Sequence, residues 1–265
     1  MNRHETAAKA LQRLSEIMHT LRAPGGCAWD AEQTITSLRQ YLIEETYEVL
    51  DALDDAPGSD AHLEELGDLL LQIVFQAEIL QETQPDFNFE SIANTITDKL
   101  IRRHPHVFGD AKADNASEAL KNWEQIKSEE RGTQKSRLHG VPKALPALLA
   151  AQRTGEKAAA TGFDWPDVNG ALLKAEEEWD EFTSALAAGE SPERISEELG
   201  DHLFAISSVA RHLNIDVESC LRSAVAKFTE RFKHMEQAAI AQGQSISDLD
   251  LNAQEALWQK AKINS

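Results

Sequence analysis

Five carboxylates occur in the same arrangement twice along the chain. The arrangement reads Glu-Glu-x-x-Glu, sixteen further residues and then Glu-x-x-Asp, and its second copy follows the first by 133 residues. Its members are Glu44, Glu45, Glu48, Glu65 and Asp68 in the first copy and Glu177, Glu178, Glu181, Glu198 and Asp201 in the second. Residues three apart share one face of a helix, so two neighbouring helices would present four oxygen-bearing side chains to each other. Because hard divalent cations prefer oxygen ligands, each copy predicts a magnesium site, in which Mn²⁺ is an acceptable substitute.

The repetition matters because one acidic run is weak evidence. Solvated helix faces carry many acids, and 45 of the 265 residues are Asp or Glu. Like charges three or four residues apart also destabilise a helix slightly unless something binds them. A pattern that recurs with both of its parts at a fixed distance therefore favours metal binding over a solvated surface.

Basic and aromatic residues follow each acidic copy. A basic pair four residues apart is followed by a tryptophan and a lysine four residues apart, as Lys99, Arg103, Trp123 and Lys127 in the first half and Lys227, Arg231, Trp258 and Lys262 in the second. The basic pairs suit phosphate oxygens that metal ions leave uncovered. An indole suits stacking on a base while its lysine reaches a phosphate. A core tryptophan beside an exposed lysine explains the second pattern equally well.

Two other metal or nucleotide sites are excluded. A ferritin-like di-iron site needs Glu-x-x-His on its helices, and no acid in either copy has a histidine three residues later. The histidines receive structural interpretations instead, with His104 and His106 organising a turn around Pro105. The chain also lacks a glycine-rich phosphate loop of the P-loop or dinucleotide type.

Composition limits the function further. The formal net charge of -19 argues against a general DNA or RNA binder, whereas a polyanionic small molecule is compatible if metal ions and a few cations screen the repulsion. The two cysteines, Cys27 and Cys220, indicate neither a disulfide framework nor a zinc site. The first eighteen residues lack the apolar core of a signal peptide, and no apolar run approaches the roughly twenty residues of a membrane span. We therefore expect a soluble protein of the cytoplasm.

Helical periodicity positions the acids. Apolar residues recur at intervals of three and four between Glu64 and Leu80 and again between Leu199 and Leu213, which predicts helices with one buried stripe. Partner helices are expected at 38–53 and 172–186, with short Asp-, Pro-, Gly- and Ser-rich connectors that permit only antiparallel neighbours. The acids should therefore lie at the margins of the buried stripes.

The duplication predicts two domains in tandem. We expect a first helical domain at 1–130, a linker at 131–146 that contains two glycines and two prolines, and a second helical domain at 147–265. A turn with a tryptophan is expected ahead of each acidic copy, at 162–166 and at 27–30. We see no alternating strand segments, so the fold class is all-α.

Several strings of residues identify a family. They are Leu42-Ile43-Glu44-Glu45-Thr46-Tyr47-Glu48-Val49-Leu50-Asp51, Glu64-Glu65-Leu66-Gly67-Asp68-Leu69-Leu70, Arg102-Arg103-His104-Pro105-His106-Val107-Phe108, Trp123-Glu124-Gln125-Ile126-Lys127 and Gly162-Phe163-Asp164-Trp165. In order and over nearly the whole chain, they resemble the MazG family of tandem-domain bacterial nucleoside triphosphate pyrophosphohydrolases.

The resemblance implies a fold, an activity and site residues. It implies all-α domains whose helix bundles are completed by homodimerisation, and hydrolysis of NTPs or dNTPs to the monophosphate and pyrophosphate. Magnesium would be held by Glu178, Glu181, Glu198 and Asp201, and by Glu45, Glu48, Glu65 and Asp68 in the first domain. Glu177 and Glu44 would orient or deprotonate the attacking water, and Lys227, Arg231, Trp258 and Lys262 would contact the nucleotide.

The two halves also differ, and alternatives remain open. His202 follows Asp201 where Leu69 follows Asp68, and Trp179 occupies an aliphatic position between acids, where its bulk would reshape the substrate end. The resemblance to tandem-domain members implies the second domain as the working site. A non-catalytic sensor that binds metal-nucleotide, or a regulatory protein that binds a partner, is the alternative from another class. A plain helical scaffold is the third. The sequence identifies neither the preferred base and sugar nor a regulatory protein partner.

Overall fold

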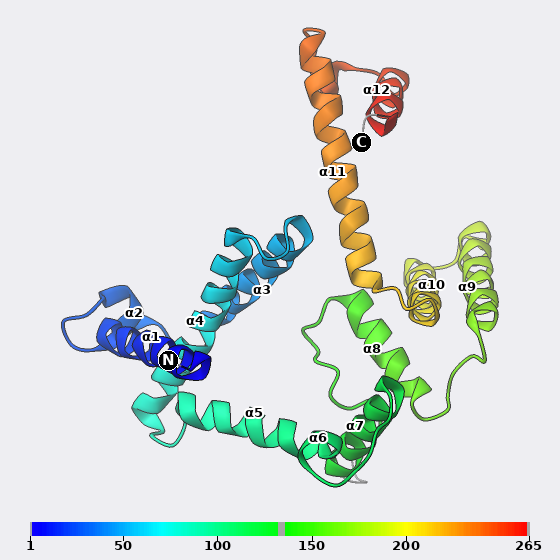
Figure 1. Ribbon diagram of the computed structural model, residues 1–265. Coiled ribbons are helices and arrows are strands. Elements are labelled where there is room, and N and C mark those ends of the chain that lie inside the picture. Colours follow the sequence, from blue (N-terminus) through cyan, green and yellow to red (C-terminus); the bar gives the residue numbers. More distant parts are fainter. Residues whose placement is uncertain (1, 132–135, 264–265) are drawn as a thin grey trace. The chain divides into compact units, whose positions relative to one another are not determined.

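The computed structural model describes residues 2–131 and 136–263, and every regular element in these two ranges is a helix (Figure 1). The chain divides into two compact units, Met1–Gly132 and Thr133–Ser265. The all-α fold class predicted from the periodicity is confirmed. The expected linker at 131–146 includes residues 132–135, which lie outside the described part, so the domain boundaries stay a prediction.

The first unit contains seven helices within its described residues. They are α1 (Arg3–Arg22), α2 (Ala28–Glu32), α3 (Leu38–Asp55), α4 (Asp60–Thr83), α5 (Phe89–Arg103), α6 (Pro105–Phe108) and α7 (Ala116–Arg131). The core lies where α1, α3 and α4 meet, around Met18, Leu38, Val74 and Phe75. Between α3 and α4, the Ser59 side chain accepts a hydrogen bond from the backbone of His62 and caps the start of α4. This short turn makes the two acid-bearing helices neighbours.

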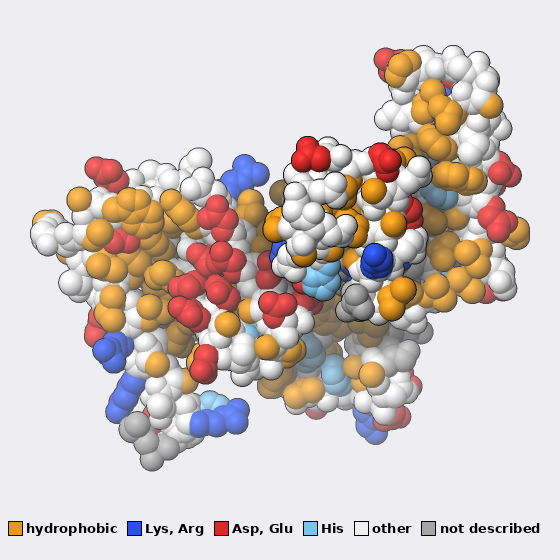
Figure 2. All heavy atoms as spheres, turned by 90° about the horizontal axis from the view of Figure 1, so that it is seen from above, with side chains coloured by type: hydrophobic (Ala, Val, Ile, Leu, Met, Phe, Trp, Pro, Cys, Tyr) orange, Lys and Arg blue, Asp and Glu red, His pale blue; other side chains and the backbone are white. Residues whose placement is uncertain are grey.

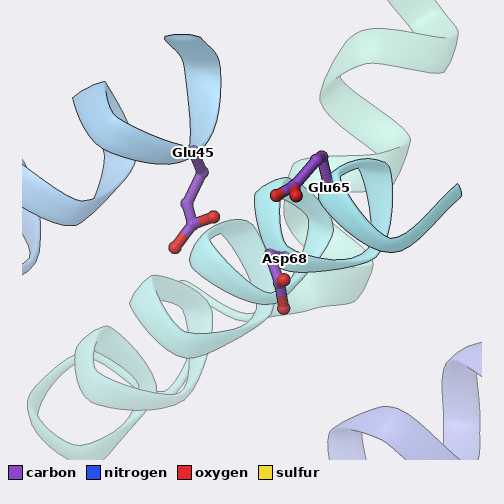
Figure 3. A group of neighbouring side chains, drawn as sticks. All are labelled: Glu45, Glu65 and Asp68. Carbon is purple, nitrogen blue, oxygen red and sulfur yellow. The ribbon is translucent and has the colours of Figure 1, made fainter. Parts of the chain in front are cut away.

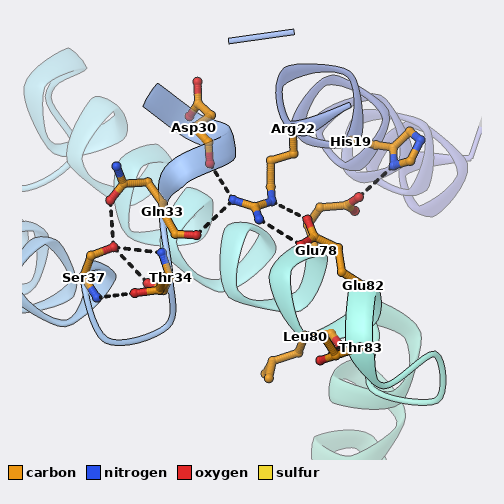
Figure 4. Close-up of polar contacts among 10 residues, drawn as sticks. All are labelled: His19, Arg22, Asp30, Gln33, Thr34, Ser37, Glu78, Leu80, Glu82 and Thr83. Carbon is orange, nitrogen blue, oxygen red and sulfur yellow. Dashed lines mark hydrogen bonds and ion pairs between the residues drawn. The ribbon is translucent and has the colours of Figure 1, made fainter. Parts of the chain in front are cut away.

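Arg22 joins three elements of the first unit. Its guanidinium donates hydrogen bonds to the carbonyl oxygens of Asp30 and Gln33, at 2.5 and 3.2 Å, and to the Glu82 carboxylate on α4 (Figure 4). The Arg22 side chain is only 6 % exposed, and its hydrogen bonds lower the pKa of Glu82. A buried arginine is stable here because its donors are paired.

This network also explains a wrong prediction. The segment from Cys27 to Asp30 was expected to form a turn, and the structure has the short helix α2 there instead. Arg22 lies earlier in the chain and binds the carbonyl oxygens of Asp30 and Gln33 at the end of α2, where a helix terminus leaves carbonyl groups with few partners of their own.

The second unit contains five α-helices and one 3₁₀ turn within its described residues. They are α8 (Ala147–Ala159), α9 (Val168–Ala188), α10 (Pro192–His212), α11 (Val217–Ala241), η1 (Ile246–Asp248) and α12 (Leu251–Ile263). The antiparallel pair α9–α10 turns at Gly189, whose φ of +66° is the left-handed conformation that ends many helices, and Ser191 caps α10. Buried alanines such as Ala171, Ala175 and Ala205 let the two helices approach closely.

The remaining helices of this unit pack around that pair. Helix α8 packs on α10, and Gln152 of α8 bonds the backbone of Ile215 and Val217 at the start of α11. Beyond this junction α11 pairs with α12 around Met235, Ala239, Leu257 and Ala261. Figure 1 shows the later turns of α11 beside α12.

Many large apolar side chains remain exposed. Figure 2 shows hydrophobic side chains over broad areas of the face seen from above, next to a gathering of Asp and Glu side chains. On α9 and α10 they include Leu173, Trp179, Leu199, Leu203 and Phe204, which are between 41 and 66 % exposed. Within the described ranges no helix is both long and apolar enough to cross a membrane. These side chains therefore leave an apolar surface on the same two helices that carry the second acidic copy.

Candidate metal and nucleotide sites

Three acids of the first copy converge between α3 and α4. Glu45 reaches from α3 toward Glu65 and Asp68 of α4 (Figure 3). One carboxylate oxygen from each lies within 4.8 Å of the others, and all three side chains are half-buried. Three carboxylates this close repel one another unless a cation lies between them.

The pKa values of these acids reflect that repulsion. Partial burial raises the pKa of Glu45 most, and the nearby charges of Asp68, Glu48 and Glu65 raise it further. Burial and then the charges of Glu48 and Asp68 raise the pKa of Glu65 in the same way. A divalent cation would remove both causes of the shift, because it replaces the lost water ligands and neutralises the like charges. The donor set therefore fits a hard divalent metal.

The other two acids of the first copy are more exposed. Glu48 raises the pKa of both Glu45 and Glu65, so its carboxylate lies beside the cluster, although it is not one of the three converging ligands. Glu44 is exposed on α3, next in sequence to Glu45. The structure thus brings together three of the four predicted ligands and places the fourth at the edge.

The second copy forms the corresponding cluster between α9 and α10. Oxygens of Glu178, Glu198 and Asp201 lie within 4.8 Å of one another. Glu178 and Glu198 are 8 and 2 % exposed, whereas Asp201 is exposed. Burial raises the pKa of Glu198 despite the opposite effect of Arg194, and the charges of Glu181 and Glu178 add to the rise. Glu181 is exposed and lies beside this cluster, as Glu48 does beside the first.

Two basic side chains pair with the acids of the second cluster. Lys174 Nζ lies 2.7 Å from Glu178 Oε1 and 2.9 Å from Glu177 Oε1. Arg194 forms an ion pair with Glu198, and its Nη1 lies 2.8 Å from Glu197 Oε2. Each cation precedes its buried partner by four residues, a helical spacing that was readable in the sequence but was not singled out.

The first cluster has no equivalent of these cations. With the shift of 133 residues, Lys174 corresponds to Tyr41 and Arg194 to Ala61. The second cluster therefore has two positive charges of its own, and the corresponding positions of the first are uncharged. Glu177 also differs from Glu44 because it takes part in the ion pair with Lys174.

The basic and aromatic residues of the first half lie on α5 and α7. Arg103 and Lys127 both lie close to the Trp123 ring, at 5.5 and 4.2 Å from its centroid. Arg103 also binds Glu130 of α7, with Nη2 at 2.6 Å from Oε2. Lys99 is half-buried one turn before Arg103 on α5. The first half thus brings Arg103, Trp123 and Lys127 together, already in contact with one another.

The corresponding residues of the second half lie on α11 and α12. Lys227 is exposed and Arg231 half-buried, one helical turn apart on α11. The centroid of the Trp258 ring lies 5.0 Å from the centroid of the Phe228 ring. Lys262 Nζ lies 5.9 Å from the same Trp258 centroid. Trp258 packs beside the α11–α12 core while Lys262 is exposed. This arrangement agrees with a core tryptophan beside an exposed lysine as well as with a nucleotide contact.

The acids of the second half and its predicted nucleotide-contacting residues belong to different helix pairs. The acids lie between α9 and α10, whereas α11 packs mainly on α8, η1 and α12. Lys227 is also about 15 Å along α11 from its first residue, from the helical rise of 1.5 Å per residue. In the described residues, neither α11 nor α12 forms a packed interface with α9.

The residues that distinguish the second half lie beside its acids. The His202 Nδ1 donates a hydrogen bond to the Ala175 carbonyl oxygen at 3.0 Å, and its ring lies 5.2 Å from that of Trp179. Trp179 in turn contacts Phe182 and is 48 % exposed. These contacts place an exposed indole next to the acid cluster.

Comparisons with known proteins agree with this geometry. Residues 33–108 and 169–236 match the MazG nucleotide pyrophosphohydrolase domain, and each match includes one acid cluster. The chain is 44 % identical over 252 residues to the nucleoside triphosphate pyrophosphohydrolase/pyrophosphatase MazG of Thermotoga maritima, covering 95 % of each chain. It is also 44 % identical over 261 residues to the nucleoside triphosphate pyrophosphohydrolase of Escherichia coli K12, covering 95 % of this chain and 97 % of that one.

Proposed function

This chain belongs to the MazG family, and from that premise we propose that it hydrolyses nucleoside triphosphates to the monophosphate and pyrophosphate. The observation that carries the proposal is the pair of carboxylate clusters, one in each matched domain. Each cluster would bind a divalent cation, the kind of ion that phosphoryl-transfer enzymes use to neutralise phosphate charge. Both ribose and deoxyribose nucleotides are proposed substrates.

We propose magnesium as the metal, with manganese as a substitute. The ligands would be Glu178, Glu181, Glu198 and Asp201 in the second unit and Glu45, Glu48, Glu65 and Asp68 in the first. The bound metal would neutralise charge that develops on the phosphates and lower the pKa of the attacking water. Mutual repulsion among the acids supports a cation in both places.

The chain's own residues would divide the remaining work. Glu177 and Glu44, which precede the first ligand of each cluster, would accept the proton of the attacking water. Lys174 and Arg194 lie on the carboxylates of the second cluster and would bring positive charge close to the phosphates of a bound nucleotide. Water would add to the α or the β phosphorus, its proton would pass to the carboxylate, and the bond between that phosphorus and the bridging oxygen would break to release the monophosphate and pyrophosphate.

We propose the second domain as the working site. It has the more buried acids, the two adjacent cations and the exposed indole of Trp179 beside the acids. The first cluster lacks those cations. Retention of its acids would then serve metal binding rather than turnover.

We also propose that the protein forms a homodimer. One chain carries its acids on α9 and α10 and the predicted nucleotide contacts Lys227, Arg231, Trp258 and Lys262 on α11 and α12, and its described residues form no packed interface between α9 and α11. A second copy that covers the exposed apolar side chains of α9 and α10 would complete the bundle. We also propose a cytoplasmic location, where nucleoside triphosphates are found and where the free Cys27 and Cys220 would stay reduced.

Product analysis tests the function. The protein is incubated with each NTP and dNTP in magnesium, and the nucleotides are separated by chromatography while pyrophosphate is measured. Monophosphate and pyrophosphate in equal amounts are expected, and Glu178→Gln or Asp201→Asn should abolish both with the helix content unchanged. Diphosphate and phosphate would mean a different reaction. Binding without any product would favour the metal-nucleotide sensor, and the absence of a magnesium-dependent melting shift would favour a plain helical scaffold.

A further inference from the structure

Glu130 holds the basic residues of the first half in place. Its Oε2 accepts hydrogen bonds from Arg103 Nη2 and Nε, at 2.6 and 3.0 Å, and its Oε1 accepts one from Arg102 Nε at 2.5 Å. The Arg103 side chain is 14 % exposed and the Glu130 side chain 23 %, so water screens this pair only partly. The two guanidinium groups hold the pKa of Glu130 down to about 2, so the carboxylate is ionised at neutral pH.

A carboxylate in this position occupies the donors that a phosphate would use. Arginine binds carboxylates and phosphates through the same fork of parallel N–H donors. With Nε and Nη2 of Arg103 on Glu130, a phosphate must displace the glutamate before it can bind both donors. Glu130 therefore competes with nucleotide for Arg103.

The indole beside Arg103 is also covered. Arg103 and Lys127 both lie within 6 Å of the Trp123 ring centroid, which is the range of a cation–π contact. The face of the ring toward these cations cannot stack on a base until they move. The same Glu130 contact that occupies Arg103 keeps it over the ring.

The second half lacks this glutamate. If Trp123 is aligned with Trp258, then Lys127 aligns with Lys262 and Glu130 aligns with Ser265. Ser265 lies outside the described residues, but a serine carries no charge that could compete with phosphate. In this alignment, the second half has an uncharged side chain at the position of Glu130.

We propose that Glu130 closes the first domain to nucleotide, so that each chain binds a nucleoside triphosphate in its second domain only. The proposal rests on the function proposed above, because it assumes that Arg103, Trp123 and Lys127 would otherwise contact nucleotide. The first domain keeps its acids, and the closure concerns its basic and aromatic residues alone.

Counting bound nucleotide per chain tests the proposal. Calorimetric titration with magnesium and an ATP analogue that has a methylene between the α and β phosphorus atoms should give one equivalent for the unchanged protein. Glu130→Ser, which copies the second half, should give two. Glu90→Ser removes the same charge at the other end of α5, and one equivalent is expected for this control. If Glu130→Ser lowers the helix content, Glu130→Gln, which keeps the side-chain size, replaces it.

A spectroscopic readout identifies the added site. Nucleotide binding to Glu130→Ser should quench tryptophan fluorescence more than in the unchanged protein, and Trp123→Phe in the same background should remove the additional quenching. One equivalent for Glu130→Ser, or two for the unchanged protein, would overturn the proposal while leaving pyrophosphate release intact. Loss of the proposed function has a different signature, in which neither protein binds the analogue and neither releases pyrophosphate.

Discussion

One lysine and one arginine give the second acid cluster of this chain two positive charges that the matching positions of the first do not supply. Lys174 and Arg194 pair with Glu178 and Glu198, whereas Tyr41 and Ala61 stand at the matching places of the first domain. A cluster with its own cations tolerates the absence of metal better than one without, because its buried carboxylates stay paired. Magnesium should therefore matter more to the stability of the first cluster than of the second.

Removal of one of these cations tests that difference. Arg194→Met leaves Glu198 buried without its partner, so we expect a lower melting temperature in metal-free buffer and recovery toward the unchanged value in saturating magnesium. Thermal denaturation with EDTA and with magnesium measures both. Arg153→Met breaks a similar exposed ion pair on α8, and its melting temperature should respond to magnesium as the unchanged protein does. Equal responses of the two variants would contradict this role for Arg194.

Substituting glutamine for the matching glutamate in each cluster tests which domain carries the activity. Glu198→Gln removes a buried ligand of the second cluster and should lower turnover by at least about 100-fold, the effect expected from loss of a metal ligand. Glu65→Gln makes the same change in the first cluster and should leave turnover within about twofold. Initial rates of pyrophosphate release measure both.

Exposed neighbours provide the controls for these variants. Glu197→Gln and Glu64→Gln each change a residue adjacent to the ligand in sequence but outside the three converging acids, and near-normal rates are expected for both. A larger loss in Glu65→Gln than in Glu198→Gln would reverse the assignment of the working domain.

At the scale of elements, the sequence predicted what is local and repetitive. The apolar stripe of α4 and the acids at its margin follow from a period of 3.6, and the α3–α4 and α9–α10 pairs follow from their short connectors. Contacts between distant residues were not readable. Helix α2 depends on Arg22, and the partner of Arg103 is Glu130, 27 residues later. No periodicity links such positions, so only the tertiary structure identifies them.

The turn before α9 is held by another contact between residues far apart in the sequence. Asp164 accepts hydrogen bonds from both terminal nitrogens of Arg211 on α10, with Nη1 at 2.9 Å from Oδ2, and His212 Nε2 lies 3.2 Å from its Oδ1. These contacts fix the segment that carries Phe163 and Trp165 against α10. The hydrogen bonds from Arg211 lower the pKa of Asp164 more than its partial burial raises it.

Neutralising Asp164 should destabilise the second unit. We expect Asp164→Asn to lower the free energy of unfolding at pH 7 by about 1 to 2 kcal/mol, the value of a hydrogen-bonded charge pair that is partly exposed. Because the folded pKa lies below the unfolded value of 3.8, the stabilisation is present above about pH 4 and is lost as the pH falls through the folded pKa.

Urea unfolding at a series of pH values measures this effect. The difference between the unchanged protein and Asp164→Asn should shrink as the pH falls below about 4, because Asp164 then becomes protonated in the unchanged protein. Asp180→Asn, an exposed change on α9, is the control and should cost little at any pH. A difference that grows as the pH falls below about 4 would contradict the assigned direction of the pKa shift.

At the scale of the whole molecule, a high net charge coexists with a large exposed apolar surface. The charge of -19 keeps chains apart, yet α9 and α10 expose several leucines together with Trp179. Magnesium bound at both clusters would reduce the repulsion between copies. Assembly of the dimer and occupancy of the metal sites are therefore expected to favour each other.

A charge placed on that apolar surface should separate the copies. Leu203 is 47 % exposed on α10, two residues after Asp201, and Leu203→Glu would bring an unpaired carboxylate into the proposed interface. Light scattering coupled to size exclusion should give twice the chain mass of 29.4 kDa for the unchanged protein and one chain mass for the variant. Pyrophosphate release should fall together with the mass, because within one chain neither α11 nor α12, as far as the structure describes them, forms a packed interface with the acid-bearing helix α9. Leu251→Glu changes a 77 % exposed leucine at the start of α12 and should keep both mass and activity.

If Leu203→Glu lost the larger mass but kept full turnover, a single chain would complete the site by itself. Helix α11 would then have to approach α9 in a way that the packing of the second unit does not show.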